Sequence, residues 1–177
     1  MARSIPRPDP SEYDPYYQGY LDQLPDGDVL DLLETQVEDT VSALQGLTPS
    51  QAGYRYAPGK WSTREVLGHM IDVERVLTYR ALRASRGDVT EIPGFEQDDY
   101  VAGGNYDERS LDDLLQEFQH VRAATLDLFR GMPDAALGRK VKANGVAVSV
   151  RALACIVTGH ERHHLRLFRE KYLPGMS

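Results

Sequence analysis

Two histidines near the carboxyl end of the chain lie one helical turn apart within an apolar pattern. His160 and His164 belong to a stretch, residues 149–173, in which apolar residues recur at intervals of three and four, as on the buried face of a helix. An imidazole in a protein core must satisfy both ring nitrogens, so a buried pair needs either a hydrogen-bond network or a metal ion. The i, i+4 spacing lets both rings reach one ion. The pair therefore predicts two ligands of a metal site.

A third histidine is expected to come from a different helix. The pattern over residues 62–85 begins with Ser62 and Glu65, which form a capping box, and His69 falls on its apolar face. Three neutral imidazoles around a divalent ion leave one position open for water or substrate, which is the arrangement of a catalytic site. The expected cofactor is therefore one divalent transition metal, zinc or nickel, and the sequence does not select between them.

Other residues near these three are weaker candidates for the site. His163 could replace His164, because an i, i+3 spacing is also feasible, although the apolar pattern favours His164. Asp72 could orient the His69 ring or pair with a neighbouring arginine. Arg122 interrupts an apolar face and could either bind an anionic substrate or extend to solvent. The alternative to a metal site is a set of three core histidines that are satisfied by hydrogen bonds.

The same histidine pair belongs to a motif that is also found in proteases. Residues 160–164 read His-Glu-x-x-His, the zinc-protease pattern in which the glutamate is the general base. Those proteases place their third ligand downstream, whereas His69 lies upstream, and no extended strand is available to bind a peptide. The context argues against a protease and leaves Glu161 as a candidate base for another hydrolysis.

Four amphipathic helices are expected to position these residues, and each has a 3.6-residue apolar period. They cover about residues 28–44, 62–85, 110–130 and 149–173. Residues 87–108 are rich in Gly, Pro and acidic side chains, and they predict a long crossover loop that lets the flanking helices run parallel. Alternating residues around Asn144 and Gly145 predict a β-hairpin.

The fold class that follows is all-α. It is a four-helix bundle with a long crossover between helices 2 and 3 and a small β-hairpin before helix 4. Residues 1–177 are expected to form a single domain, with an extended N-terminal arm over residues 1–25.

Composition limits the partners and the location. The 20 Lys and Arg residues against 27 Asp and Glu residues give a formal charge of -7, which argues against a nucleic-acid partner or an anionic membrane. No apolar run approaches the roughly 20 residues of a spanning helix, and the first residues lack the basic and apolar segments of a secretory signal. A cytoplasmic location is expected.

Three segments resemble the DinB-like superfamily, and the resemblance extends over roughly residues 30–173. The segments are GKWSTREVLGHMIDVERV at 59–76, PGFEQDDY at 93–100 and GHERHHLRLFREKYL at 159–173. The resemblance implies a four-helix bundle with a crossover. It also implies a metal held by one histidine of the second helix and two of the fourth, here His69, His160 and His164.

The resemblance also implies an activity and an assembly. Several members resemble thiol transferases that use bacillithiol, mycothiol or glutathione, and members are often dimers. The expectation is therefore a homodimeric, metal-dependent thiol S-transferase with a small-molecule substrate. The alternatives are a metal-dependent hydrolase with Glu161 as base, or a non-catalytic, stress-related metal-binding bundle.

Overall fold

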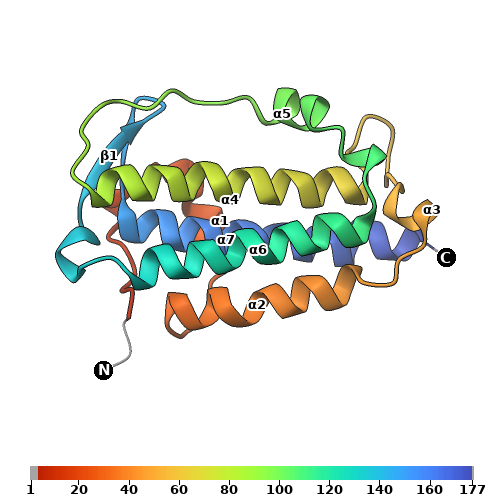
Figure 1. The fold of residues 1–177 in the computed structure, drawn as a ribbon, viewed down its shortest axis with the longest axis horizontal. Helices are drawn as coiled ribbons and strands as arrows, with labels where there is room; N and C mark the ends of the chain where they lie inside the picture. Colours follow the sequence, from red (N-terminus) through yellow and green to blue (C-terminus); the bar gives the residue numbers. More distant parts are fainter. Residues whose placement is uncertain (1–3, 177) are drawn as a thin grey trace.

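Four long helices form the body of the molecule, and each begins at a side chain that caps its first turn. The computed structural model describes residues 4–176. The helices are α2 (Val29–Leu44), α4 (Thr63–Ser85), α6 (Leu111–Arg130) and α7 (Val150–Leu167) (Figure 1). Their capping residues are Asp28, Ser62, Ser110 and Ser149, and each of these side chains accepts a backbone hydrogen bond. Short polar side chains in the sequence therefore determine where the bundle helices start.

The helices pack in a ring in which α4 and α2 each contact both α6 and α7. Helices α4 and α6 run in the same direction, and the long connection between them crosses the outside of the bundle (Figure 1). The prediction of a four-helix bundle with a crossover is confirmed. Across residues 4–176, no helix combines the length and the apolar composition that crossing a lipid bilayer requires.

The crossover is not wholly a loop, and on this point the prediction is wrong. It contains the helix α5 (Gln97–Gly104) and a 3-10 turn, Tyr106–Glu108. Helix α5 has eight residues, of which only Val101 is buried, and no side chain caps its start. Such a short helix cannot show a sustained apolar period, which is why the sequence pattern did not reveal it.

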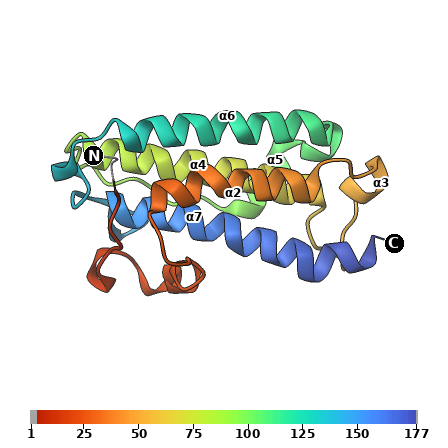
Figure 2. The same cartoon turned by 90° about the horizontal axis from the view of Figure 1, so that it is seen from below.

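The N-terminal arm is likewise more folded than the predicted extended segment. It forms two 3-10 turns, Pro10–Glu12 and Pro15–Tyr17, followed by the short helix α1 (Gln18–Leu21). Asp9 and Asp14 precede the two prolines, and each aspartate side chain accepts a backbone hydrogen bond from its turn. Helix α1 packs against α7, so the arm lies along one side of the bundle (Figure 2).

The predicted hairpin is present and is tied to the crossover. Strands β1 (Lys140–Ala143) and β2 (Val146–Ser149) pair antiparallel, and both Asn144 and Gly145 have positive φ, as an Asn-Gly turn requires. Ile92 forms a parallel bridge to Ala143, in which the Ile92 amide donates to the Lys142 carbonyl at 2.9 Å. The hairpin thus holds the first part of the crossover against the bundle.

The end of the fourth helix changes its hydrogen-bond pattern. After Leu167 the chain continues as a π-helical segment, Phe168–Tyr172, and a 3-10 turn, Leu173–Gly175. The helical extent predicted for residues 149–173 is confirmed.

The short helix α3 (Pro49–Ala52) precedes α4. It lies at the end of the bundle where the carboxyl end of the chain also lies (Figure 1).

Two apolar clusters fill the bundle, and on α2, α6 and α7 buried polar residues lie between them. One cluster contains Leu33, Leu77 and Leu153, and the other contains Leu67 and Phe118. The polar residues between them include the two histidines of α7.

Candidate metal centre

Three imidazole rings converge between α4 and α7. The Nε2 atom of His160 lies 3.1 Å from Nε2 of His69 and 3.1 Å from Nε2 of His164. One ring nitrogen from each histidine lies within 4.8 Å of the others. The side chains are 3% (His69), 6% (His160) and 8% (His164) exposed. The three histidines singled out from the sequence therefore form one buried cluster.

Ordinary two-centre hydrogen bonds do not satisfy both contacts of the central ring. The Nε2 atom of a neutral imidazole either carries one proton or offers one lone pair, yet Nε2 of His160 faces two other Nε2 atoms. Burial lowers the pKa of His69 to about 4, and it holds the pKa values of His160 and His164 well below 6.5. The rings are therefore neutral near pH 7, and their lone pairs are available to a ligand.

The spacing of the nitrogens fits a divalent ion. Two nitrogens that each lie about 2.1 Å from one ion are roughly 3.0–3.4 Å apart, for angles between a right angle and the tetrahedral value. The two 3.1 Å separations that involve His160 fall in this range, and the ligand nitrogens of His69 and His164 lie within 4.8 Å of each other. Three neutral imidazoles also suit zinc, nickel and neighbouring transition metals. The donor set and its geometry thus fit a three-histidine metal site.

Aromatic rings hold the histidines from outside the cluster. The Trp61 ring lies 4.7 Å from the His69 ring, and the Tyr20 ring packs edge-on against the His160 ring at 5.4 Å. Nδ1 of His164 is buried and has no hydrogen-bond partner among residues 4–176. Packing, rather than the usual outer hydrogen bond, therefore fixes the orientation of the His164 ring.

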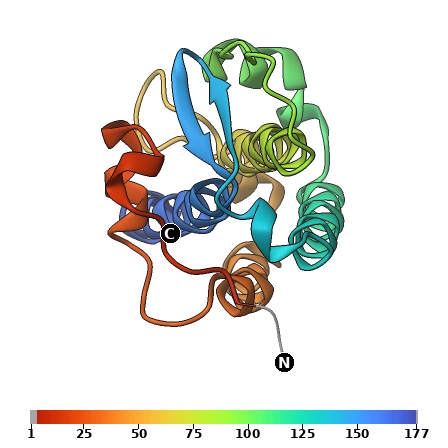
Figure 3. The same cartoon turned by 90° about the vertical axis from the view of Figure 1, so that its left-hand side faces the viewer.

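A cavity of about 380 Å³ opens onto His69 and His160. Its walls come from α4 and α7 and from the N-terminal arm, the crossover and the hairpin, which lie on the side of the bundle away from α2 (Figure 3). The polar and aromatic residues of these walls include Tyr17, Tyr20, Arg80, Phe95 and Asn144. The cavity could admit a small molecule to the histidine cluster.

These wall residues were not identified from the sequence. Arg80 alone carries a signal, because it follows His69 by eleven residues, about three helical turns, and so shares its face of α4. The other wall residues come from segments that lack a periodic pattern, and only the folded structure brings them to the cavity.

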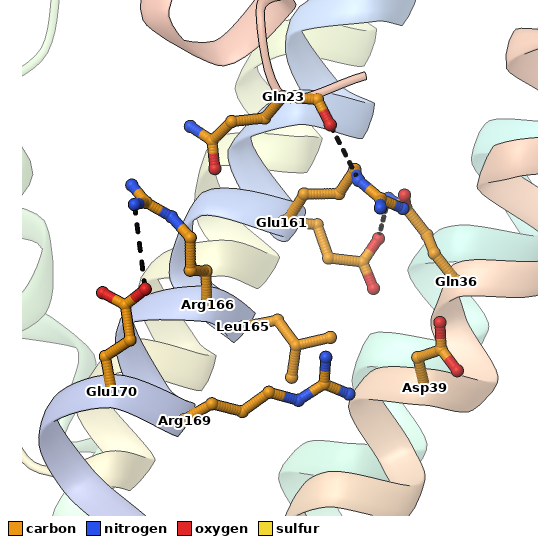
Figure 4. A pocket seen from close by; sticks show the side chains of 9 residues that line it. Gln23, Gln36, Asp39, Glu161, Leu165, Arg166, Arg169 and Glu170 are labelled. Carbon is orange, nitrogen blue, oxygen red and sulfur yellow. Dashed lines mark hydrogen bonds and ion pairs between the residues drawn. The ribbon is translucent and has the colours of Figure 1, made fainter. Parts of the chain in front are cut away.

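Glu161 lies on a different side of α7, in a buried ionic network. Its carboxylate accepts hydrogen bonds from Arg122 at 2.7 Å, from Thr40 at 2.7 Å and from Gln36. Burial raises the pKa of Glu161. The residue lines a second cavity, of about 360 Å³, between α2 and α7 (Figure 4). Its carboxylate is therefore engaged away from the cavity that opens onto the histidines.

Arg122 is the centre of this network. Its guanidinium is 1% exposed, donates two hydrogen bonds of 2.9 Å to Glu74 and one to Glu161, and reaches the Leu33 carbonyl at 2.9 Å. The sequence analysis considered Arg122 either as a ligand of an anionic substrate or as a side chain that extends to solvent. In the structure it is instead buried and paired with two carboxylates. The sequence could not reveal it, because both carboxylates come from other helices.

Asp72 and His163 occupy peripheral positions. Asp72 accepts a hydrogen bond from the Tyr106 hydroxyl. Within residues 4–176 it has no hydrogen bond or ion pair to His69 or to an arginine, contrary to both sequence interpretations. His163 is partly exposed and packs on the rings of Tyr20 and His164, outside the three-histidine cluster. The i, i+4 pair is thus the one that converges with His69.

Comparisons with known proteins agree with this fold. The family model of the DinB superfamily matches residues 32–168. YfiT from Bacillus subtilis, described as a probable metal-dependent hydrolase with an unusual four-helix bundle topology, has a similar structure. Its TM-score is 0.67, at 17% identity over 92% of this chain and 91% of YfiT. No curated protein sequence matches the chain.

A second solved structure is the mycothiol-dependent maleylpyruvate isomerase. Its TM-score is 0.66, at 17% identity over 82% of this chain, which spans 61% of that protein. At this level of identity, both likenesses establish the fold and not the reaction.

Proposed function

The chain belongs to the DinB superfamily, and from this premise we propose that it is a divalent-metal-dependent enzyme that transfers a low-molecular-weight thiol to an electrophilic small molecule. The observation that carries the proposal is the cluster of neutral histidines at one wall of the 380 Å³ cavity. His69, His160 and His164 would hold the ion. When bound, a divalent ion with an open position lowers the pKa of a thiol, so that a thiolate is available near neutral pH.

The surroundings of the cluster support thiol transfer over hydrolysis. Hydrolysis would need a general base beside the attacking water, and the carboxylate next in sequence, Glu161, is bonded to Arg122 on another side of α7. The group of potential ligands consists of three histidines and contains no carboxylate. A thiol needs no such base once its pKa is lowered, and its proton can pass to solvent.

The tyrosines of the cavity are suited to binding and orientation. Burial raises the pKa of Tyr20 to about 12 and also raises that of Tyr17. Both hydroxyls therefore stay protonated near neutral pH and can donate hydrogen bonds to a bound molecule. In the proposed reaction a carbon–sulfur bond forms, the bond from that carbon to its leaving group breaks, and no oxidant is needed.

Metal-assisted hydrolysis is the second candidate, because YfiT is described as a probable metal-dependent hydrolase. It would need Glu161 to leave Arg122 and act as base. A non-catalytic, dimeric metal-binding bundle is the third candidate, and it predicts that the ion binds without any turnover.

Turnover and metal content test the proposal together. Protein loaded separately with zinc and nickel would be incubated with bacillithiol, mycothiol or glutathione and a chloro-aromatic acceptor, while chloride release and thiol loss are followed. We expect about one ion per chain and equal amounts of chloride released and thiol consumed with at least one thiol. Absence of turnover with every thiol in fully loaded protein would reject the transferase proposal and leave the other two candidates.

A further inference from the structure

A buried cation lies in the wall of the cavity beside the histidine cluster. Arg80, on α4, is 5% exposed and lines the same cavity as His69 and His160. Its Nε has no hydrogen-bond partner among residues 4–176, and its Nη2 reaches only the Pro93 carbonyl, at a long 3.5 Å. The Tyr17 hydroxyl is its other polar neighbour. Both of these neighbours are uncharged.

Arg80 differs from Arg122, which is also buried, in its partners. Arg122 is paired with two carboxylates, Glu74 and Glu161, whereas within the described part of the chain Arg80 forms no ion pair. A buried charge without a partner is costly, and proteins normally compensate it with an opposite charge. An anion that enters the cavity would supply that charge.

The geometry of the guanidinium suits an oxyanion. The Phe95 ring lies 6.0 Å from Cζ, close enough for a cation–π contact, and the unpartnered Nε–H belongs to the edge that binds carboxylates bidentately. Acidic side chains, Asp14 and Glu96, also line the cavity. They would repel a doubly charged phosphate more strongly than a singly charged carboxylate, so the cavity favours the carboxylate.

The position of Arg80 sets the length of the ligand. Eleven residues separate it from His69, so the two Cα atoms are about 16 Å apart along α4 and lie on the same face. Both side chains lean toward the amino end of the helix, and the arginine is the longer of the two, so the guanidinium covers part of this separation. The remaining span is on the order of 10–15 Å. The side chains of Tyr17, Tyr20 and Asn144 line the same cavity and offer neutral polar groups to a bound molecule.

We propose that Arg80 anchors a carboxylate of the small molecule that reacts at the histidine cluster, so that the substrate is an elongated monoanion. The proposal rests on the proposed function for the reacting end of this molecule, and on Arg80 alone for its anionic end. It makes Arg80 a specificity-determining residue of the cavity.

Three probes of equal chain length separate the two ends. Mercaptooctanoate carries both a thiol and a carboxylate, mercaptooctanol lacks the carboxylate, and octanoate lacks the thiol. Their affinities would be measured by calorimetry on the zinc-loaded and the metal-free protein, and on the zinc-loaded variants Arg80→Met, Arg80→Lys and, as the control, Arg83→Met. Arg83 lies on the same helix and pairs with Asp88 at the surface.

We expect mercaptooctanoate to bind at least about tenfold more tightly than mercaptooctanol, as a charged hydrogen-bonded pair provides. Arg80→Met should remove this preference, Arg80→Lys should keep part of it, and Arg83→Met should leave it unchanged. Arg80→Met should fold, because it removes an unpaired buried charge, and its melting temperature would be recorded in parallel.

The outcomes distinguish this proposal from the proposed function. If octanoate binds in an Arg80-dependent way while neither thiol gains affinity from zinc, the anion site stands and the thiol chemistry fails. If the thiols need zinc but the carboxylate gives no preference, or the preference survives in Arg80→Met, the Arg80 proposal is overturned. A marked loss of thermal stability in Arg80→Met, with no change in the preference, would assign Arg80 a structural role.

Discussion

Burial prepares the three histidines for metal binding by making protonation unfavourable. Desolvation is the main cause of the lowered pKa of each ring, with smaller contributions from neighbouring histidines. Only a neutral imidazole binds a metal ion. Burial keeps the three rings neutral, so each has a lone pair available for the ion. The apolar stripe of α7 is therefore part of the site and not only of the core.

His164 should be essential for metal binding, and His163 should not. His164→Ala removes one of three converging nitrogens, so we expect metal affinity to fall more than about a hundredfold, beyond the 10–100-fold typical of outer-shell changes. His163→Ala is the matched control, because this ring is next in sequence but lies outside the cluster. Competition with a chromogenic chelator measures both. Equal losses in the two variants would contradict the assignment.

The role of Glu161 can be separated from that of a catalytic base. Glu161→Gln keeps a hydrogen-bonding side chain beside Thr40 and leaves Arg122 paired with Glu74, so we expect a cost of about 1–2 kcal/mol in the free energy of unfolding. Turnover per bound ion should be retained. Urea unfolding and the thiol assay measure the two quantities.

Arg122→Met is the companion variant for this network. It leaves Glu74 and Glu161 buried without a cation, and breaking such a pair costs about 3–5 kcal/mol in the free energy of unfolding.

The outcome that would contradict the structural role of Glu161 is a loss of turnover in Glu161→Gln with unchanged stability and metal content. That result would favour the hydrolase.

The histidine cluster could be predicted from the sequence because its members lie on periodic helix faces. Arg80 shares such a face, but its role depends on Phe95 and Tyr17, which reach it from segments without a period. Asp72 was misassigned for a similar reason. Its partner, Tyr106, comes from the crossover, which the sequence pattern did not resolve.

At the scale of elements, helix starts and the hairpin could be predicted because their signals are local. Ser62 and Glu65 satisfy each other's backbone within one turn, and Asn144 and Gly145 supply the two positive φ angles of the hairpin turn. The arm and the crossover depend instead on contacts with α7 and α4. No pattern within these segments could show that they would form the walls of one cavity.

The arm approaches α7 closely at Gly159. A Cβ atom at this position would overlap the backbone carbonyl of Tyr20, whose ring packs on His160. We therefore expect Gly159→Ala to displace the arm and to speed backbone hydrogen exchange in α1 by about tenfold or more. The bundle itself should not lose stability, because alanine improves helix propensity by about 1 kcal/mol over glycine.

The control for this variant is Gly103→Ala, where a Cβ atom would meet nothing within 4 Å. Its exchange pattern in the arm should match that of the unchanged protein. Unaltered protection of α1 in Gly159→Ala would show that the arm does not depend on this close approach. A concurrent loss of substrate affinity would connect the arm to the cavity that it covers.

At the scale of the whole molecule, polar groups occupy the middle of the bundle between two apolar clusters. Arg122, Glu74 and Glu161 compensate one another there, while the histidines beside them lack an equivalent partner within the described residues. The formal charge of -7 would slow the approach of an anionic substrate, so recognition must come from local groups such as Arg80. The same negative net charge favours the approach of a metal cation to the histidine cluster.

An ion bound only by the folded state should stabilise the whole bundle. At a free metal concentration of a hundred times Kd, the gain is about 2.7 kcal/mol. For a domain of this size, each kcal/mol shifts the melting temperature by roughly 2–4 °C. Removing the metal with a chelator should therefore lower the melting temperature by about 5–10 °C, as measured by calorimetry, and re-addition of zinc should restore it.

The same chelation applied to His164→Ala gives the decisive comparison. This variant lacks one metal ligand. Its melting temperature should therefore be below that of the metal-loaded unchanged protein, and the chelator should not lower it further. An equal drop in both proteins would mean that the chelator acts elsewhere. No drop in the unchanged protein, despite proven loss of metal, would mean that the ion adds nothing to the stability of the fold and would contradict this prediction. If the unchanged protein holds no metal at all after incubation with zinc, the core-histidine alternative would replace the metal site at His69, His160 and His164.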